Sequence, residues 1–222
     1  MTLGIFQILL IIFGASMVTI LVIMRVAAVR IIHTHHGQKC DFFAAHPVQP
    51  GDIVFLGDSL TDGARWDEIF PHLPVKNRGI NADTTLGVLA RLDSILPGKP
   101  AAIFLLIGTN DLPWYIFRSN AAILQTYREI IARIQTESPN THIHVQSLLP
   151  RGMRYAVRIQ TLNRELEIMA AQTGCLFIDI HPALAGPHGE LRPEFTNDNL
   201  HLMAAGYTVW KKALLPYLDA LA

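Results

Sequence analysis

The sequence predicts an α/β fold: a three-layer sandwich with a central, mostly parallel five-stranded sheet, preceded by one N-terminal transmembrane helix. Three observations predict it. Short, nearly continuous apolar runs, typical of strands buried on both faces, recur from residue 52 onward. Segments with a helical period near 3.6 separate these runs, which indicates βα units and helices on both sides of a parallel sheet. A long, uncharged apolar stretch precedes them all.

The apolar stretch runs from Leu3 to Met24, and Gln7 is its only strongly polar side chain. At about 1.5 Å per residue it can cross a hydrocarbon core of roughly 30 Å. A cleaved signal peptide is an alternative, but it usually has a basic segment before a shorter apolar core. No Lys or Arg precedes this one. We therefore expect residues 1–30 to form a membrane anchor, with cleavage, or a buried helix of a soluble protein, as the alternatives.

Basic residues follow this stretch, and none precedes it. Arg25, Arg30 and Lys39 come directly after it. By the positive-inside rule, this asymmetry favours the cytoplasmic face for the rest of the chain. The bias rests on few charges, and an enzyme acting on envelope esters would be expected outside. The sequence therefore leaves the side open.

Residues 31–51 are predicted to be a linker, because glycines and prolines are frequent between Gly37 and Gly51. Three histidines, His33, His35 and His36, raise the possibility of a metal site. No cysteine or carboxylate cluster is near enough to complete a closed ligand set, so we expect a solvated turn and no metal. The chain has two cysteines, which do not form a disulfide framework.

Residues 52–222 are predicted to form a single domain. The chain carries 18 basic and 18 acidic residues, and this balance argues against a nucleic-acid partner. The predicted strands are 53–56, 74–77, 101–107, 142–148 and 176–180. The predicted helices have the apolar faces Ile123, Tyr127, Ile130 and Ile134; Ile159, Leu162, Leu166 and Met169; and Tyr207, Trp210, Leu214, Leu218 and Leu221.

The first chemical motif follows the first strand. Residues 57–63 read Gly-Asp-Ser-Leu-Thr-Asp-Gly, which places Ser59 at a glycine turn where a nucleophile can be exposed. This is not the G-x-S-x-G elbow of α/β-hydrolases, because Thr61 replaces the second glycine. A serine that only caps the next helix is the alternative interpretation.

Two further motifs follow the second and third strands. In residues 77–85, Gly79 can bring a backbone N–H close to a reacting oxygen. In residues 108–111, Asn110 carries an amide that can donate to an oxyanion. An ordinary strand-to-helix turn and an Asx turn are the respective structural alternatives.

The fourth motif lies in a polar loop before the last helix. A serine nucleophile needs a base, and the base needs a carboxylate to fix its tautomer. Asp198 and His201, three residues apart, can supply both. A surface histidine without a role is the alternative.

Together, and in this order, the four motifs resemble the SGNH (GDSL) hydrolase family, which is named for Ser, Gly, Asn and His in four blocks. The resemblance covers about residues 52–220. It implies Ser59 as nucleophile, His201 as base and Asp198 as orienting acid. It also implies an oxyanion hole made by Ser59, Gly79 and Asn110. The segments 77–85, 108–112 and 146–150 are similar to bacterial esterases that resemble the catalytic subunits of platelet-activating-factor acetylhydrolase.

One residue departs from the family pattern. Asn199 stands where the last block usually has glycine after the aspartate. Asn tolerates left-handed backbone angles better than most residues, so we expect the loop geometry to survive.

The resemblance implies a serine esterase that hydrolyses short-chain or acetyl esters through an acyl-enzyme on Ser59, without a cofactor. The alternatives are a lysophospholipase or thioesterase, an acyltransferase, and a non-catalytic binding module. Candidate substrate-pocket residues are Trp114, Tyr115 and Arg151. Arg151 lies near two other arginines that could meet a phosphate or an acidic sugar, although a solvated helix face is the favoured explanation for them. The sequence does not indicate which lipid, carbohydrate or other small-molecule ester is the substrate, nor the oligomeric state.

Overall fold

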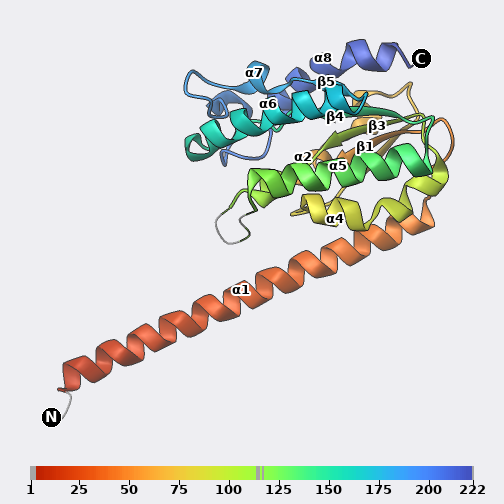
Figure 1. Ribbon diagram of the computed structural model, residues 1–222. Helices are drawn as coiled ribbons and strands as arrows, with labels where there is room; N and C mark the ends of the chain where they lie inside the picture. The colour runs from red at the N-terminus through yellow and green to blue at the C-terminus, as the bar shows by residue number, and fades with distance from the viewer. Residues whose placement is uncertain (1–3, 114–115, 117, 222) are drawn as a thin grey trace. The chain divides into compact units, whose positions relative to one another are not determined.

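The computed structural model describes residues 4–113, 116 and 118–221. The chain divides into two compact units, with the division between Asp41 and Phe42. The first unit is helical, and the second contains the sheet (Figure 1). The predicted substrate-pocket residues Trp114 and Tyr115 lie outside the described residues.

The N-terminal helix is longer than expected. Helix α1 spans Ile5–Ala45, so most of the predicted linker of residues 31–51 is helical. The helix ends just before His46, because Pro47 disfavours the helical conformation of the residue that precedes it. The window of α1 that is long and apolar enough to cross a membrane lies within Leu9–Ala45, and none of it is buried. The second unit begins ten residues before the predicted domain boundary at residue 52.

The predicted five-stranded sheet is confirmed, and every strand pair is parallel. The strand order is β2-β1-β3-β4-β5. The strands are β1 (Ile53–Gly57), β2 (Val75–Gly79), β3 (Ala102–Leu106), β4 (His142–Gln146) and β5 (Leu176–Ile178). The chain moves from β1 to β2 on one side and then past β1 to β3 on the other. This reversal creates a topological switch point, where open α/β sheets bind their ligands beyond the carboxyl ends of the strands.

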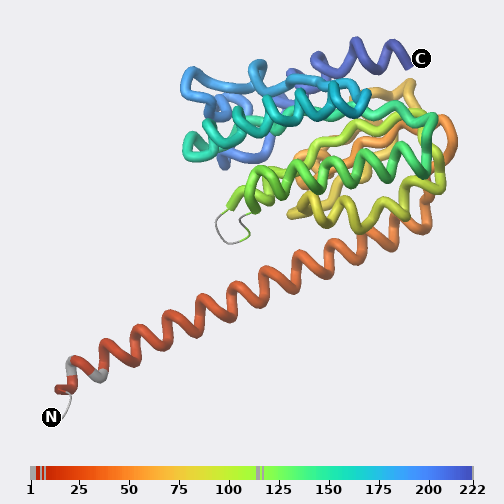
Figure 2. The backbone as a smooth tube through the Cα atoms, viewed as in Figure 1, coloured from red at the N-terminus to blue at the C-terminus, as the bar shows by residue number. Residues whose placement is uncertain are grey.

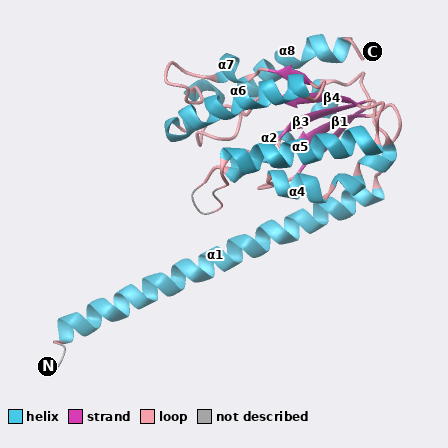
Figure 3. Ribbon diagram, viewed as in Figure 1, coloured by secondary structure: helices cyan, strands magenta, loops and turns pink. Residues whose placement is uncertain are grey.

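Helices cover both faces of the sheet, as Figure 3 shows. The α-helices of this unit are α2 (Ser59–Asp62), α3 (Trp66–Ile69), α4 (Thr85–Ala90), α5 (Asn120–Glu137), α6 (Ala156–Gln172), α7 (His181–Leu184) and α8 (Ala204–Asp219). Short 3₁₀ turns are η1 (Leu92–Ser94), η2 (Leu96–Gly98), η3 (Thr109–Asp111), η4 (Met153–Tyr155) and η5 (Pro193–Phe195). Helices α5 and α6 lie side by side (Figure 2).

Alternation along the strands divides the core into two layers. Val54 and Leu56 of β1 pack with α4, α5 and α6, and all predicted apolar positions of α5 and α6 are buried there. Phe55 points to the opposite face, where it packs with residues of α2, α3, α7 and α8. Its ring stacks on Trp66 at a centroid distance of 4.1 Å and on Phe104 at 5.2 Å. The three-layer α/β/α sandwich is therefore confirmed.

The last turn of α1 and the residues between it and β1 are packed onto the sheet domain. Phe43 is 2% exposed and Val48 3%. The guanidinium of Arg78 lies over the Phe43 ring at 4.6 Å and donates to the His46 carbonyl oxygen at 2.6 Å. Residues 42–51 therefore belong to the folded domain rather than to a free linker.

Two truncations test this boundary. A chain that starts at Phe42 should unfold in urea with the full stability of the domain. A chain that starts at Asp52 should lose roughly 3 kcal/mol or more of unfolding free energy, because it lacks two buried apolar side chains. Equal urea midpoints for the two truncations would show that residues 42–51 contribute nothing.

Candidate active site

The adjacent strands β2, β1 and β3 bring the first three motifs together at the carboxyl ends of the strands. In the parallel register, Gly57 of β1 lies opposite both Gly79 of β2 and Leu106 of β3. The ends of three neighbouring strands are therefore followed by Ser59 after β1, by the turn at residues 80–83 after β2, and by Asn110 after β3. Ser59 is the first residue of α2, and the Asp58 side chain caps this helix by accepting a hydrogen bond from the Leu60 N–H at 3.0 Å.

The structure brings Ser59, His201 and Asp198 together in one hydrogen-bonded row. Ser59 Oγ lies 3.0 Å from His201 Nε2. His201 Nδ1 lies 2.6 Å from Asp198 Oδ2. With the proton on Nδ1, the ring donates to the carboxylate, and Nε2 can accept the serine proton. Serine and histidine are 142 residues apart in the chain, so this contact is made by the fold alone.

Local hydrogen bonds hold Asp198 in its place. Its Oδ1 accepts from the backbone N–H groups of Leu200, at 2.9 Å, and His201, at 2.8 Å. Although desolvation opposes ionisation, the bonds from the ring and backbone of His201 and from Leu200 lower the pKa of Asp198 to about 2. Asn199 has φ +63°, which confirms the expected left-handed conformation at the position that departs from the family pattern.

Gly79 lies at the expected strand end, but its N–H is already engaged. It donates to Asn77 Oδ1 at 2.9 Å. A Cβ on Gly79 would lie 2.2 Å from the backbone nitrogen of Asp62, so glycine is required here for close packing. The expected role of Gly79 as an oxyanion donor does not fit this arrangement.

Ala82, three residues further on, is placed differently. It has φ +62°, an uncommon conformation for alanine. Its N–H makes no hydrogen bond with any described residue. No signal in the sequence marks this position, because an alanine is not an expected residue at a left-handed turn.

Asn110 lies in the turn after β3, and its side chain points toward the turn that contains Ala82 and Asp83. Its Nδ2 donates to the Asp83 carbonyl oxygen at 2.9 Å, which leaves the second amide hydrogen for another acceptor. Asn77, whose role the sequence did not reveal, joins β2 to α2. Its Nδ2 contacts the carbonyl oxygens of Thr61 at 3.0 Å, Asp62 at 3.2 Å and Ala64 at 3.0 Å.

Two hollows adjoin the hydrogen-bonded row. One, of about 550 Å³, lies beside Asp198 and is lined by Arg151, Gly152, Met153, Arg154, Tyr155, Glu190, Asn199 and Leu200. Arg151 stacks on the Tyr155 ring at 4.1 Å and donates to the Thr109 carbonyl oxygen at 2.9 Å. The other, of about 590 Å³, includes Gly63, Ile69, Leu202 and Tyr207. Arg158 lines neither hollow. Its guanidinium donates instead to Asn120 Oδ1 and to the carbonyl oxygens of Leu112 and Arg118.

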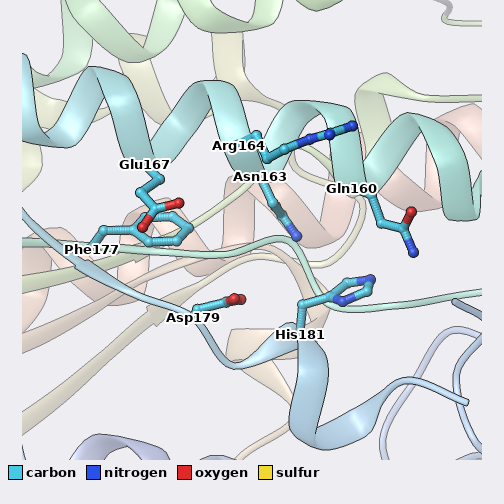
Figure 4. Close-up of a pocket in the computed structure, with 7 residues that line it drawn as sticks. All are labelled: Gln160, Asn163, Arg164, Glu167, Phe177, Asp179 and His181. Carbon is cyan, nitrogen blue, oxygen red and sulfur yellow. The ribbon is translucent and has the colours of Figure 1, made fainter.

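A third hollow, of about 310 Å³, lies between α6, β5 and α7 (Figure 4). It contains none of the predicted site residues. Figure 4 shows side chains of α6, among them Asn163 and Gln160, above Asp179 and His181. Within the described part of the chain, no group of three or more His, Cys, Asp or Glu side chains is arranged to hold a metal ion.

Asp58 is the most perturbed carboxyl group beside the site. It is fully buried, and its Oδ2 has no partner among the described residues. Burial raises its pKa to about 7, and the charges of Asp83 and Asp111 act in the same direction. Its position next to Ser59 makes its protonation relevant to the stability of the turn that carries the serine.

A doubly wound α/β sandwich with a serine, a histidine and a carboxylate in a hydrogen-bonded row at the switch point has the architecture of a serine hydrolase. The GDSL-like Lipase/Acylhydrolase family model matches residues 55–209. The chain therefore belongs to this family, and it is a carboxylic ester hydrolase of the GDSL type.

Individual relatives support this family assignment. The alpha1 subunit of platelet-activating factor acetylhydrolase IB from Rattus norvegicus is 29% identical over 174 residues, covering 73% of each chain. The alpha2 subunit from the same organism is 29% identical over 168 residues, covering 70% of this chain and 71% of its own. A Streptococcus pneumonia structure, assigned as a platelet activating factor, superposes with a TM-score of 0.79 at 29% identity, covering 88% of this chain and 98% of that one.

The buried Asp58 predicts a pH effect on stability. Its pKa rises from 3.8 to about 7 on folding, so between these values the folded protein retains a proton that the unfolded chain has lost. The unfolding free energy should therefore fall as the pH rises from 4 to 7. Asp58→Asn should show a smaller fall in urea titrations over this range. Parallel curves for the two proteins would contradict the assignment.

Proposed function

We propose that this enzyme hydrolyses short-chain esters, acetyl esters in particular, through an acyl-enzyme on Ser59. The observation that carries the proposal is the row of Ser59, His201 and Asp198, with distances of 3.0 and 2.6 Å between the interacting atoms. These distances fall within hydrogen-bond reach, as nucleophile, base and orienting acid require.

The mechanism follows from the donors and acceptors of this row. His201 Nε2 takes the proton of Ser59 Oγ as the oxygen attacks the ester carbonyl carbon. Asp198 stays ionised, since its pKa is about 2, and stabilises the imidazolium. The imidazolium then gives its proton to the leaving alcohol. In the second half, His201 activates a water molecule that attacks the acyl-enzyme and releases the acid.

The oxyanion would be held by the N–H of Ser59 and the side-chain amide of Asn110. For the third donor we propose the N–H of Ala82 in place of Gly79, because the Gly79 N–H is bonded to Asn77. The left-handed φ of Ala82 supports this choice, since it places an N–H without a partner among the described residues in the turn beside the serine. Donors fixed before the reaction stabilise the developing charge without reorganisation.

The acetyl preference is supported by the relatives named as acetylhydrolases. The hollow beside Asp198 carries two guanidinium groups, those of Arg151 and Arg154, both over the Tyr155 ring, and suits the alcohol part of the substrate. A lipid alcohol, a carbohydrate alcohol or a thiol remain alternatives, as does an acyl acceptor other than water. The compact row of three residues speaks against a non-catalytic binding module.

Labelling tests the nucleophile. A fluorophosphonate should modify Ser59, and Ser59→Ala should abolish hydrolysis of 4-nitrophenyl acetate, whereas Ser16→Ala in α1 should be labelled and active like the unmodified protein. We expect 4-nitrophenyl acetate to be hydrolysed with a higher kcat/KM than the octanoate. An adduct on another serine would refute the proposal. A higher kcat/KM for the octanoate ester than for the acetate would instead favour a lysophospholipase or thioesterase.

We also propose that α1 anchors the enzyme in a membrane. The support is an unburied window within Leu9–Ala45 that is long and apolar enough to span a bilayer. A signal sequence passes the same test. The basic residues Arg25 and Arg30 after the apolar stretch favour a domain on the cytoplasmic face.

Fractionation tests the anchor. The full chain should stay in the membrane fraction after carbonate washing, while a chain that starts at Phe42 should be soluble and active. Alkaline phosphatase and a fluorescent protein, each fused to Ala222, report the side. A bright fluorophore with an inactive phosphatase is expected, and the reverse pattern would place the domain outside. Recovery of the full chain in the carbonate supernatant would refute the anchor.

A further inference from the structure

Arg91 is a buried side chain that no step of the mechanism uses. It follows α4 directly and is 6% exposed. Its Nε donates to Asp83 Oδ2 at 2.7 Å. Its Nη2 donates to two carbonyl oxygens, that of Gly57 at 3.0 Å and that of Arg78 at 2.9 Å.

These three acceptors belong to two of the three segments that carry the proposed oxyanion donors, and the third segment is bonded to Asp83. The Gly57 carbonyl ends β1, two residues before Ser59. The Arg78 carbonyl lies in β2, where the turn that contains Ala82 begins. Asp83 ends that turn, and its own carbonyl oxygen accepts the amide of Asn110. One guanidinium therefore joins the segments of Ser59 and Ala82 directly, and that of Asn110 through Asp83.

The chemistry of this contact requires arginine. A guanidinium presents several N–H groups in a planar fork, whereas a lysine ammonium is a point charge on a flexible stem. The carboxylate of Asp83 is 2% exposed, so it depends on its partner for charge compensation. A Cβ at Gly87 would lie 1.7 Å from Asp83 Oδ1, so the backbone of α4 leaves room for this carboxylate only with glycine there.

We propose that Arg91 is a positioning residue, which sets the geometry of the oxyanion donors without touching the substrate. The inference rests on the proposed function. The guanidinium contacts the backbone and the Asp83 carboxylate of the donor segments, so Arg91 acts on the transition state through Asp83 and Asn110. A donor displaced by about 1 Å lowers the rate by about 10²-fold, with little effect on ground-state binding.

The primary experiment measures kcat and KM for 4-nitrophenyl acetate in full-length variants. Arg91→Gln should lower kcat about 10²-fold and leave KM within about threefold. Arg91→Lys, which keeps the charge opposite Asp83 but loses the fork, should fold and recover part of kcat. Arg133→Gln is the matched control, because Arg133 also forms two ion pairs, with Asp93 and Glu137, away from the site. It should keep kcat within about twofold.

A double-mutant cycle shows whether Arg91 acts through Asn110. Asn110→Ala should cost on the order of 10²–10³ in kcat. If Arg91 positions this amide, the combined Arg91→Lys and Asn110→Ala variant should be little slower than Asn110→Ala alone. A merely structural role would make the two losses multiply. Should Arg91→Gln fail to fold, the Arg91→Lys cycle decides.

The outcomes separate the inference from the proposed function. Multiplying losses, or an Arg91→Lys enzyme that matches the unmodified one in kcat, would overturn the positioning role while Ser59→Ala remains inactive. An active Ser59→Ala enzyme would instead overturn the proposed mechanism. A change confined to KM would make Arg91 a determinant of substrate binding and would also refute the inference.

Discussion

The backbone of α2 approaches the ends of the neighbouring strands so closely that no side chain fits between them. A Cβ on Gly79 would lie 2.2 Å from the nitrogen of Asp62 in α2. One on Gly57 would lie 2.3 Å from Thr61 Oγ1 in α2 and 2.2 Å from the Leu106 carbonyl oxygen of β3. Contacts this short exclude every residue except glycine. Because the residues at both strand ends have no side chain, α2 can begin directly over the edge of the sheet. Ser59 is thereby placed at the switch point between β1 and β3.

Once α2 lies over the strand ends, its backbone needs partners, and side chains from other segments supply them. Asn77 uses one amide to hold three carbonyl oxygens around α2 and its oxygen to accept the Gly79 N–H. Arg91 makes a comparable set of contacts, in which it holds Gly57, Arg78 and Asp83. The edge of the sheet is thus joined by long-range polar contacts whose loss would leave buried groups unpaired, which is costly.

The sequence predicted those features that local pattern encodes. Apolar runs predicted the strands, and the period of 3.6 predicted the buried faces of α5 and α6. Motif order predicted that Ser59, Asp198 and His201 would meet. It did not predict Ala82 or Arg91, because their roles depend on the paths of residues far apart in the chain. The helical continuation to Ala45 was also missed, because Gly37 and the histidines suggested a break, whereas only Pro47 ends the helix.

Helix α8 closes the site both by a polar contact with α2, the helix that begins at Ser59, and by packing against an aromatic cluster. Helix α8 begins three residues after His201, and Tyr207 donates to the Leu60 carbonyl oxygen at 2.9 Å. Trp210, fully buried, packs edge-on against Trp66 at a centroid distance of 5.1 Å and donates to Gln146 at 2.7 Å. The loop that carries the histidine is therefore fixed to the same aromatic cluster that supports β1. Since an exposed loop has little stability of its own, the 3.0 Å distance between histidine and serine depends on this cluster.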